Sequence, residues 1–329
     1  MKHLLSISAL LVPLAFGTFG NNANAACSTT STYAQTKYPI VLVPGGFGFV
    51  NLGGVVPYFY QIPEELRCHG ATVLTPQISA IATSEQRGEQ VRAYLETYFA
   101  LHPEVEKVHL QSHSHGAGAI RYVAATMPGR IASVTAVAGN VNGNYVAQLY
   151  TDTSNKLGLA GDFIDWAVQE IGGAIGILIG FLSSGDNLPQ DPLETIKEIS
   201  LDGMASFNTR YPAAVPATRC GQGEALVNGI HYFSWTGSAI NTNFLDPTSY
   251  NTILDSINRS ISKKVTGVAE KSDSVVGQCE SHLGQVIRDD YRMNHFDEVN
   301  HVFGLVDSGS VNPKTVWKQH ANRLKTMGL

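Results

Sequence analysis

The stretch VHLQSHSHGA, residues 108–117, decides the fold that the sequence predicts. It begins as a short strand and runs through a tight turn into a helix-like stretch, Gly116 to Met127. A sharp strand-to-helix turn strains the serine at its centre, so the residues two before and two after that serine must be small. Ser112 and Gly116 hold those places around Ser114. The stretch therefore predicts a nucleophile elbow of the form S-x-S-x-G, with Ser114 as the nucleophile.

The sequence around this elbow alternates strands with helices. Short apolar, β-branched runs predict strands, at 38–43, 71–75, 108–110 and 131–138, and longer periodic stretches predict helices, at 84–101 and 116–127. The helix at 84–101 is expected to present one apolar face, made of Val91, Tyr94, Leu95, Tyr98 and Leu101. Alternation with short turns predicts a mostly parallel central sheet with helices on both faces, as in the α/β-hydrolase fold.

The composition suits one large domain. The chain has 329 residues, of which 43% are hydrophobic, and its formal net charge is -5 with no basic patch. Such a chain can bury a single core, so residues 26–329 are expected to form one α/β domain. Nucleic acid is not an expected partner, because nothing concentrates positive charge.

The N-terminus has the pattern of a secretory signal peptide. Lys2 precedes the apolar stretch Leu4 to Phe16, and Ala23-Asn24-Ala25 matches an A-x-A cleavage site. Residues 1–25 are therefore expected to be removed during export through the periplasm, which leaves a secreted protein without a stable transmembrane anchor. A lipoprotein anchored at Cys27 is the less favoured alternative, because Asn24 stands where such signals usually carry an aliphatic residue.

Four cysteines remain after cleavage: Cys27, Cys68, Cys220 and Cys279. An even number in an exported protein favours disulfide bonds, although four cysteines allow three pairings. The sequence contains no CxxC and no Cys/His metal spacing, so a zinc site is not predicted.

The oxyanion hole of such a fold is made by main-chain N–H groups. One donor is the residue after the nucleophile, which is His115, and the other comes from the loop after the first strand. That loop is Pro44-Gly45-Gly46-Phe47, in which Gly46 is the expected donor.

The acid and the base should follow the nucleophile in the order Ser, Asp, His. Asp273 stands in the polar turn of residues 271–277, and His295 follows it within the stretch NHFDE. Asp273 would orient the imidazole of His295, which would take the proton of Ser114 and return it to the leaving alcohol. Three other histidines are treated as bystanders: His231, His282 and His301.

The middle of the chain carries an unusual apolar stretch. Residues 171–182 (IGGAIGILIGFL) are almost wholly apolar, and they follow a helix-like segment at 162–170. The stretch is short for a bilayer span. It is expected to be either a buried helix of an α-rich insertion or a mobile lid that meets lipid, within a helical lid region at about 145–210.

The residues now described are similar to those of the secreted bacterial lipases of the Pseudomonas and Burkholderia type. The resemblance runs along most of the mature chain, and its most specific stretches are NHFDEVN at 294–300 and QHANRLK at 319–325. It extends to five further stretches: YPIVLV at 38–43, RGEQ at 87–90, HSHG at 113–116, RYVAA at 121–125 and YFSWTG at 232–237. The resemblance implies the triad Ser114, Asp273 and His295.

The resemblance also implies a structural Ca²⁺ beside the loop of His295. Asp255 and Asp297 would provide carboxylate oxygens, and His301 and Leu305 would provide main-chain carbonyls, which are ligands that suit calcium. The family's one disulfide matches Cys220 and Cys279, which leaves Cys27 and Cys68 as a second pair or as free thiols. A dedicated lipase-specific foldase is a further implied partner.

Departures from the family are concentrated near the chemistry. Pro44-Gly45-Gly46 stands where the family usually has His-Gly-Leu, and Ser112 and His115 replace a glycine and a glutamine of the elbow. Asn140-Val-Asn-Gly143 likewise replaces a Pro-His-Arg-Gly segment. These differences predict a distinct subfamily.

The sequence thus predicts a secreted serine lipase that hydrolyses acylglycerol esters at a lipid–water interface through an acyl-Ser114 intermediate. An esterase or polyester hydrolase, acting on shorter or polymeric substrates, is the alternative. A non-catalytic binding protein on a hydrolase scaffold is less favoured, because such a protein need not retain the serine, the aspartate and the histidine in order.

Overall fold

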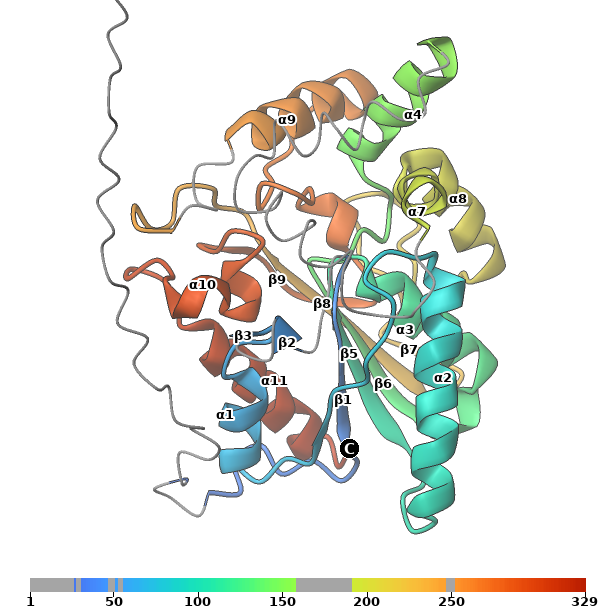
Figure 1. Cartoon of the computed structure of the whole chain (residues 1–329), viewed down its shortest axis with the longest axis vertical. Coiled ribbons are helices and arrows are strands. Elements are labelled where there is room, and N and C mark those ends of the chain that lie inside the picture. Colours follow the sequence, from blue (N-terminus) through green and yellow to red (C-terminus); the bar gives the residue numbers. More distant parts are fainter. Residues whose placement is uncertain (1–26, 28–30, 47–50, 53–55, 158–190, 247–251) are drawn as a thin grey trace, which may run out of the picture.

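The computed structural model describes residues 27, 31–46, 51–52, 56–157, 191–246 and 252–329 (Figure 1). The expected signal peptide, and the stretch at 162–182 that was expected to form a helix or a lid, lie outside the described residues.

A seven-stranded sheet forms the centre of the molecule (Figure 1). Its strand order is β4-β1-β5-β6-β8-β7, with β9 also paired to β8, and all pairs are parallel except β7 with β8. The strands are β1 (Ile40–Val43), β4 (Val73–Leu74), β5 (Val108–His113), β6 (Ile131–Val137), β7 (Leu226–Val227), β8 (Ile230–Gly237) and β9 (Gln285–Tyr291). A separate antiparallel pair is formed by β2 (Asn51–Leu52) and β3 (Val56–Pro57). The mostly parallel sheet that the sequence predicts is confirmed.

Helices cover both faces of this sheet. In Figure 1, α2 (Ser84–Leu101) and α3 (Gly116–Thr126) lie on one side, and α1 (Ile62–Cys68) and α11 (Pro313–Thr326) lie on the other. The remaining helices are α4 (Tyr145–Leu157), α7 (Pro192–Ile199), α8 (Leu201–Arg210), α9 (Thr252–Thr266) and the short α10 (His301–Gly304). Both α4 and α9 lie beyond the end of the sheet that is opposite the C-terminus (Figure 1).

Strand β1 shows why the sheet needs cover on both faces. Its four residues are all fully buried. Successive side chains of a strand point to opposite faces. Val41 and Val43 accordingly pack in the core that α2 and α3 close, while Ile40 and Leu42 pack in the core that α1 and α11 close.

Helix α2 begins and ends where the sequence predicts, at Ser84 and Leu101. A capping box starts it, since the side chain of Thr83 accepts from the N–H of Gln86 and the side chain of Gln86 accepts from the N–H of Thr83. Of the expected apolar face, Val91 and Leu95 are buried, whereas Tyr94 is 36% exposed and Leu101 is 72% exposed.

Candidate active site

Ser114 occupies the strained turn that the elbow motif predicts. It follows β5 directly and has a φ of +54°, in the left-handed region that a serine rarely adopts. Its N–H donates to Val137 O at 2.9 Å, and its carbonyl accepts from Ala117 N at 3.0 Å as α3 begins. Gly116 must be small, because a Cβ there would lie 2.7 Å from Pro44 O.

Asp273 and His295 form the second part of the site. The Nδ1 of His295 lies 2.7 Å from Asp273 Oδ2, and the N–H of His295 donates to the carbonyl of Asp273 at 2.9 Å. The other carboxylate oxygen of Asp273 accepts from the N–H groups of Val275 and Val276. The carboxylate of Asp273 is fully buried, and its contacts fix its orientation toward Nδ1 of the imidazole.

The imidazole of His295 lies beside the elbow. Its ring centroid is 4.4 Å from that of His113, the residue immediately before Ser114. The serine comes from the end of β5, the aspartate from the turn after α9, and the histidine from the loop after β9. Three segments that are far apart in the chain therefore meet at one edge of the sheet.

The two expected oxyanion donors are neighbours. A Cβ placed on Gly46 would lie 3.7 Å from the Cβ of His115. The preceding glycine is still closer to the elbow, because a Cβ on Gly45 would lie 2.7 Å from the Cβ of Ser114. The loop after β1 thus packs directly on the nucleophile turn, and only glycine permits the approach.

A buried arginine braces this loop. Arg87 donates from one guanidinium nitrogen to Pro44 O at 2.6 Å and to Gly45 O at 2.7 Å, and its Nε donates to Ser79 O. Burial lowers the pKa of Arg87 to about 10, which still leaves it charged at neutral pH. The sequence indicated Arg87 only as part of a family match. No local sequence pattern predicts that this side chain hydrogen-bonds a loop more than 40 residues away.

A second buried network surrounds His113. Its Nδ1 hydrogen-bonds Tyr58 Oη at 2.6 Å, and its Nε2 lies 3.2 Å from Glu298 Oε2. Burial lowers the pKa of His113 well below its usual value and, with the charge of Asp273, raises the pKa of Glu298 well above it. Burial thus disfavours the charged form of both side chains. Glu298 also lies 4.0 Å from Nδ1 of His295.

Sequence reasoning missed Glu298 and Tyr58. Glu298 stands within the family-specific stretch at 294–300, three residues after His295. That short spacing was the signal in the sequence that could have placed Glu298 near the site. Among the described residues, one group of three His, Cys, Asp or Glu side chains lies close enough together to share a metal ion. Its members are His113, His295 and Glu298. Both ring nitrogens of His113 are engaged, with Tyr58 and with Glu298, and Nδ1 of His295 is engaged with Asp273.

The other histidines occupy different environments. His282 lies with Nδ1 2.9 Å from Gly221 O and Nε2 3.0 Å from Asp289 Oδ2. His301 packs its ring against Tyr58, at 5.4 Å between centroids. His231 stacks on Phe233 within β8. None of these contacts involves Asp273.

One of the expected calcium ligands makes other contacts. Asp255 is engaged elsewhere, because its carboxylate accepts from Arg259 Nε and from Ser272 Oγ, both at 2.7 Å. Besides burial, the negative charges of two other acids, Asp246 and Asp307, raise the pKa of Asp297. Asp246 is almost fully buried, and its Oδ2 lies 3.5 Å from Asn294 Nδ2. The N–H of Asn294 in turn donates to Asp297 Oδ2.

Asp297 itself has the properties of a cation ligand. Its Oδ1 is buried without a hydrogen-bond donor among the described residues. Burial raises its pKa to about 7, and the negative charges of Asp246 and Asp307 act in the same direction. The side chain of Asn243 donates to Val306 O at 3.2 Å, so the loop of Asp246 lies next to the segment of Leu305. A buried carboxylate oxygen without a donor is the kind of hard oxygen ligand that calcium takes.

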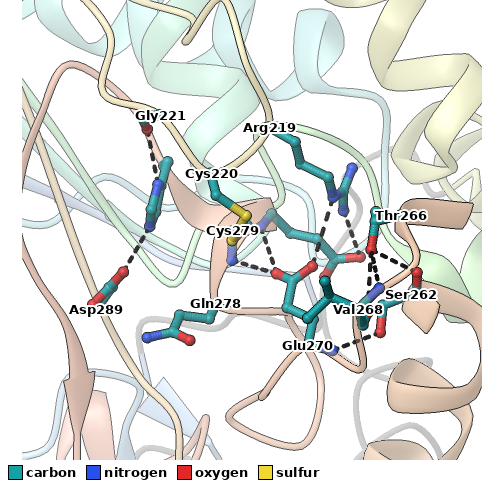
Figure 2. The surroundings of a disulfide bond; sticks show 12 residues. Arg219, Cys220, Gly221, Ser262, Thr266, Val268, Glu270, Gln278, Cys279 and Asp289 are labelled. Carbon is teal, nitrogen blue, oxygen red and sulfur yellow. Dashed lines mark hydrogen bonds and ion pairs between the residues drawn. A yellow bond between two sulfur atoms is a disulfide. The ribbon is translucent and has the colours of Figure 1, made fainter.

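All four cysteines are paired. Cys220 bonds to Cys279, as the resemblance implies (Figure 2). Cys27 bonds to Cys68, so these two form the second pair and are not free thiols. Cys279 opens the short 3₁₀ helix η3 (Cys279–Ser281), just after the turn of Asp273. The disulfide in Figure 2 therefore ties the acid-bearing turn to the segment before β7.

Comparison with known proteins gives consistent results. Residues 38–174 match the family model described as the alpha/beta hydrolase fold. The chain is 39% identical to a triacylglycerol lipase of Vibrio cholerae, over 98% of this chain and 100% of that protein. It is 36% identical to a triacylglycerol lipase of Pseudomonas fragi, over 90% and 98%. The solved structure of EstA from Clostridium botulinum covers 90% of this chain and 89% of its own, with a TM-score of 0.55 at 18% identity, and supports the fold.

Proposed function

Because the chain belongs to the triacylglycerol lipase family and has the α/β-hydrolase fold, we propose that Ser114, His295 and Asp273 are the triad of this carboxylic-ester hydrolase. The observation that carries the proposal is the 2.7 Å contact between Asp273 Oδ2 and His295 Nδ1, made beside the strained turn of Ser114.

Acylation follows from this arrangement. His295 Nε2 takes the proton of Ser114 Oγ as the oxygen attacks the ester carbonyl. Asp273, which holds Nδ1–H, stabilises the imidazolium. The N–H groups of Gly46 and His115 receive the negative charge that develops on the carbonyl oxygen, and each such donor is worth about 3 kcal/mol in the transition state. His295 then protonates the leaving alcohol, and the acyl group stays on Ser114.

Deacylation reverses the roles. A water molecule replaces the alcohol, His295 takes one of its protons, and the water oxygen attacks the acyl carbon. When the second tetrahedral intermediate collapses, the proton returns to Ser114 Oγ and the fatty acid leaves.

Labelling with a fluorophosphonate tests this proposal. We expect one adduct on Ser114 in the folded protein, and a loss of at least about 10⁴-fold in kcat for Ser114→Ala. Ser206→Ala, which changes an exposed serine on α8, is the control and should retain activity and labelling. If folded protein takes no label at Ser114, a non-catalytic role on this scaffold becomes the better explanation.

Acylglycerols at a lipid–water interface are the proposed substrates. Support comes from the apolar stretch at 171–182 and from an open groove of about 370 Å³ between α4 and α9, lined in part by Leu149, Ile257 and Ile261. Helices α4, α7 and α8 fall within the proposed lid region. Hydrolysis should be compared across acyl lengths, with dissolved and emulsified esters. A preference for short, dissolved esters would favour the esterase alternative.

A structural calcium ion is also proposed. Asp246 and Asp297 would hold it with their carboxylates, and His301 and Leu305 with their main-chain carbonyls. When bound, the ion would neutralise the buried acids and tether the loop that carries His295. Chelation should lower Tm and activity together, and Asp297→Asn should remove the effect. Unchanged melting in metal-free protein would reject the site.

We further propose export through the periplasm, removal of residues 1–25 and assistance by a lipase-specific foldase. Two disulfides support an oxidising compartment. No helix in the described part of the chain is long and apolar enough to cross a membrane. N-terminal sequencing of the extracellular protein, from cells with and without a foldase, tests all three points.

A further inference from the structure

Two buried glutamates lie behind the turn that carries Asp273. Glu280 is fully buried and Glu270 is nearly so. Arg219, the neighbour of Cys220, lies between them, with its Nε 3.6 Å from Glu270 Oε2 and one NH₂ nitrogen 3.5 Å from Glu280 Oε1 (Figure 2). One guanidinium therefore faces two carboxyl groups next to the Cys220–Cys279 disulfide.

The two carboxyl groups hold the backbone that closes the turn. Glu280 accepts from Gly277 N, and Glu270 accepts from Cys279 N and, at 3.2 Å, from Glu280 N. The turn itself is closed by the N–H of Gln278, which donates to Lys271 O at 2.8 Å. Val276, one residue before Gly277, donates its N–H to the carboxylate of Asp273. The position of Asp273 thus depends on a backbone that these glutamates hold.

The same glutamates bind the first residue of α4. Tyr145 donates its hydroxyl to Glu270 Oε2 at 3.1 Å and its N–H to Glu280 Oε1 at 3.0 Å. The guanidinium of Arg219 lies over the ring of Tyr145, 4.5 Å from its centroid, and donates to Asn142 O. The cluster therefore connects the Asp273 turn with the loop after β6 and with the start of the proposed lid region.

The charges in this cluster do not balance if both glutamates are ionised. The titratable groups that face Glu280 are Arg219, Glu270 and Tyr145, so one positive charge would meet two negative ones. Burial raises the pKa of Glu280 to about 8, with the guanidinium of Arg219 opposing the shift. Removing one partner of a buried ionic group is costly because it leaves charge without compensation.

We propose that Arg219, Glu270 and Glu280 are positioning residues that hold the Asp273 turn in register with His295, and that the Cys220–Cys279 disulfide keeps Arg219 in place. The inference rests on the proposed triad and assigns these residues no contact with substrate. The carboxyl groups take up the N–H groups of the turn, and the guanidinium compensates their charge.

Steady-state kinetics on a dissolved ester, p-nitrophenyl butyrate, test the inference. We expect Arg219→Met to lower kcat about tenfold, because the imidazole loses its alignment, while KM changes little. Arg219→Lys keeps the charge and should recover part of kcat. The double variant Arg219→Met/Glu270→Gln should recover more than Arg219→Met, because it also removes the carboxylate that the guanidinium no longer compensates.

The pH dependence of kcat separates a positioning role from a merely structural one, because a merely structural role would not change it. In the wild type, ionisation of Glu280 above pH 8 adds a buried charge and should lower kcat. Glu280→Gln should remove this alkaline decline. Arg210→Met, which breaks an exposed ion pair with Glu85, is the matched control and should behave as wild type.

Wild-type kcat and pH profile in Arg219→Met would overturn the inference. So would a loss that neither Arg219→Lys nor the double variant relieves, since the charge would then be irrelevant. Both results leave the triad intact if Ser114→Ala remains inactive. Activity retained by Ser114→Ala would instead overturn the triad itself, and the positioning role with it.

Discussion

At the scale of single residues, the candidate site is built from buried polar side chains that hold one another. Asp273 has both oxygens engaged, by His295 on one side and by the N–H groups of Val275 and Val276 on the other. Burying a polar group costs free energy unless it is hydrogen-bonded, so full engagement stabilises one orientation. The orientation of His295 follows from that of Asp273.

Arg87 provides the first prediction. Arg87→Met removes the donors to Pro44 O and Gly45 O and should let the oxyanion loop relax. We expect kcat on a dissolved ester to fall about 10²-fold with little change in KM. Arg92→Met on the same helix changes a more exposed arginine and is the control. Equal kinetics for the two variants would contradict the role of the brace.

Glu280 predicts a pH dependence of stability. Its pKa is raised from 4.5 to about 8 on folding, so the folded state retains a proton that the unfolded state releases between these values. Its contribution to stability is therefore present below pH 4.5 and is lost as pH rises to about 8. The Tm of Glu280→Gln relative to wild type should increase across this window. Thermal scans at stepped pH measure it, and the exposed Glu64→Gln should show no such trend.

At the scale of elements, the elbow is a strand, a turn and a helix that a ten-residue stretch encodes. The strain at Ser114 is local, but it is tolerated because the loop after β1 packs on the turn. Gly116 is one place where these two segments approach closely, since a Cβ there would meet the carbonyls of Val43 and Pro44.

Gly116→Ala should therefore be destabilising. Carbonyl oxygens at 2.9 Å and 2.7 Å from the new Cβ belong to the backbone and must shift, which we expect to cost about 1–3 kcal/mol. Gly129→Ala is the matched control, because nothing lies within 4 Å of a Cβ there. Urea unfolding of both variants measures the difference. An equally stable Gly116→Ala would mean that the loop and the elbow do not pack as described.

At the scale of the whole molecule, the site joins segments from the two halves of the chain. The elbow and oxyanion loop come from the first half, while Asp273, His295 and the proposed calcium ligands come from the last third. The sheet brings them together because β1, β5 and β6 are followed in order by β8 and β9. Cross-links that restrain the last third should therefore affect the chemistry more than those near the N-terminus.

The two disulfides test this idea. They span 41 and 59 residues, so loop entropy predicts that each stabilises the fold by a similar amount, about 4 kcal/mol. Replacing Cys220 and Cys279 by serine should lower both Tm and kcat. Replacing Cys27 and Cys68 should lower Tm but leave the kcat of the folded enzyme unchanged. Equal effects on kcat would refute a specific role for Cys220–Cys279.

The sequence by itself determined the parts that depend on neighbours along the chain. Apolar periodicity was enough to predict α2, and small residues around Ser114 were enough to predict the elbow. The order of Asp273 and His295 after the serine gave the candidates at the sheet edge. Only the tertiary structure decided which distant groups meet: Asp246 beside Asp297, Glu298 beside His113, and Arg219 between two glutamates. Local backbone geometry is set by adjacent residues, whereas these contacts depend on how segments far apart pack, and no local pattern encodes that packing.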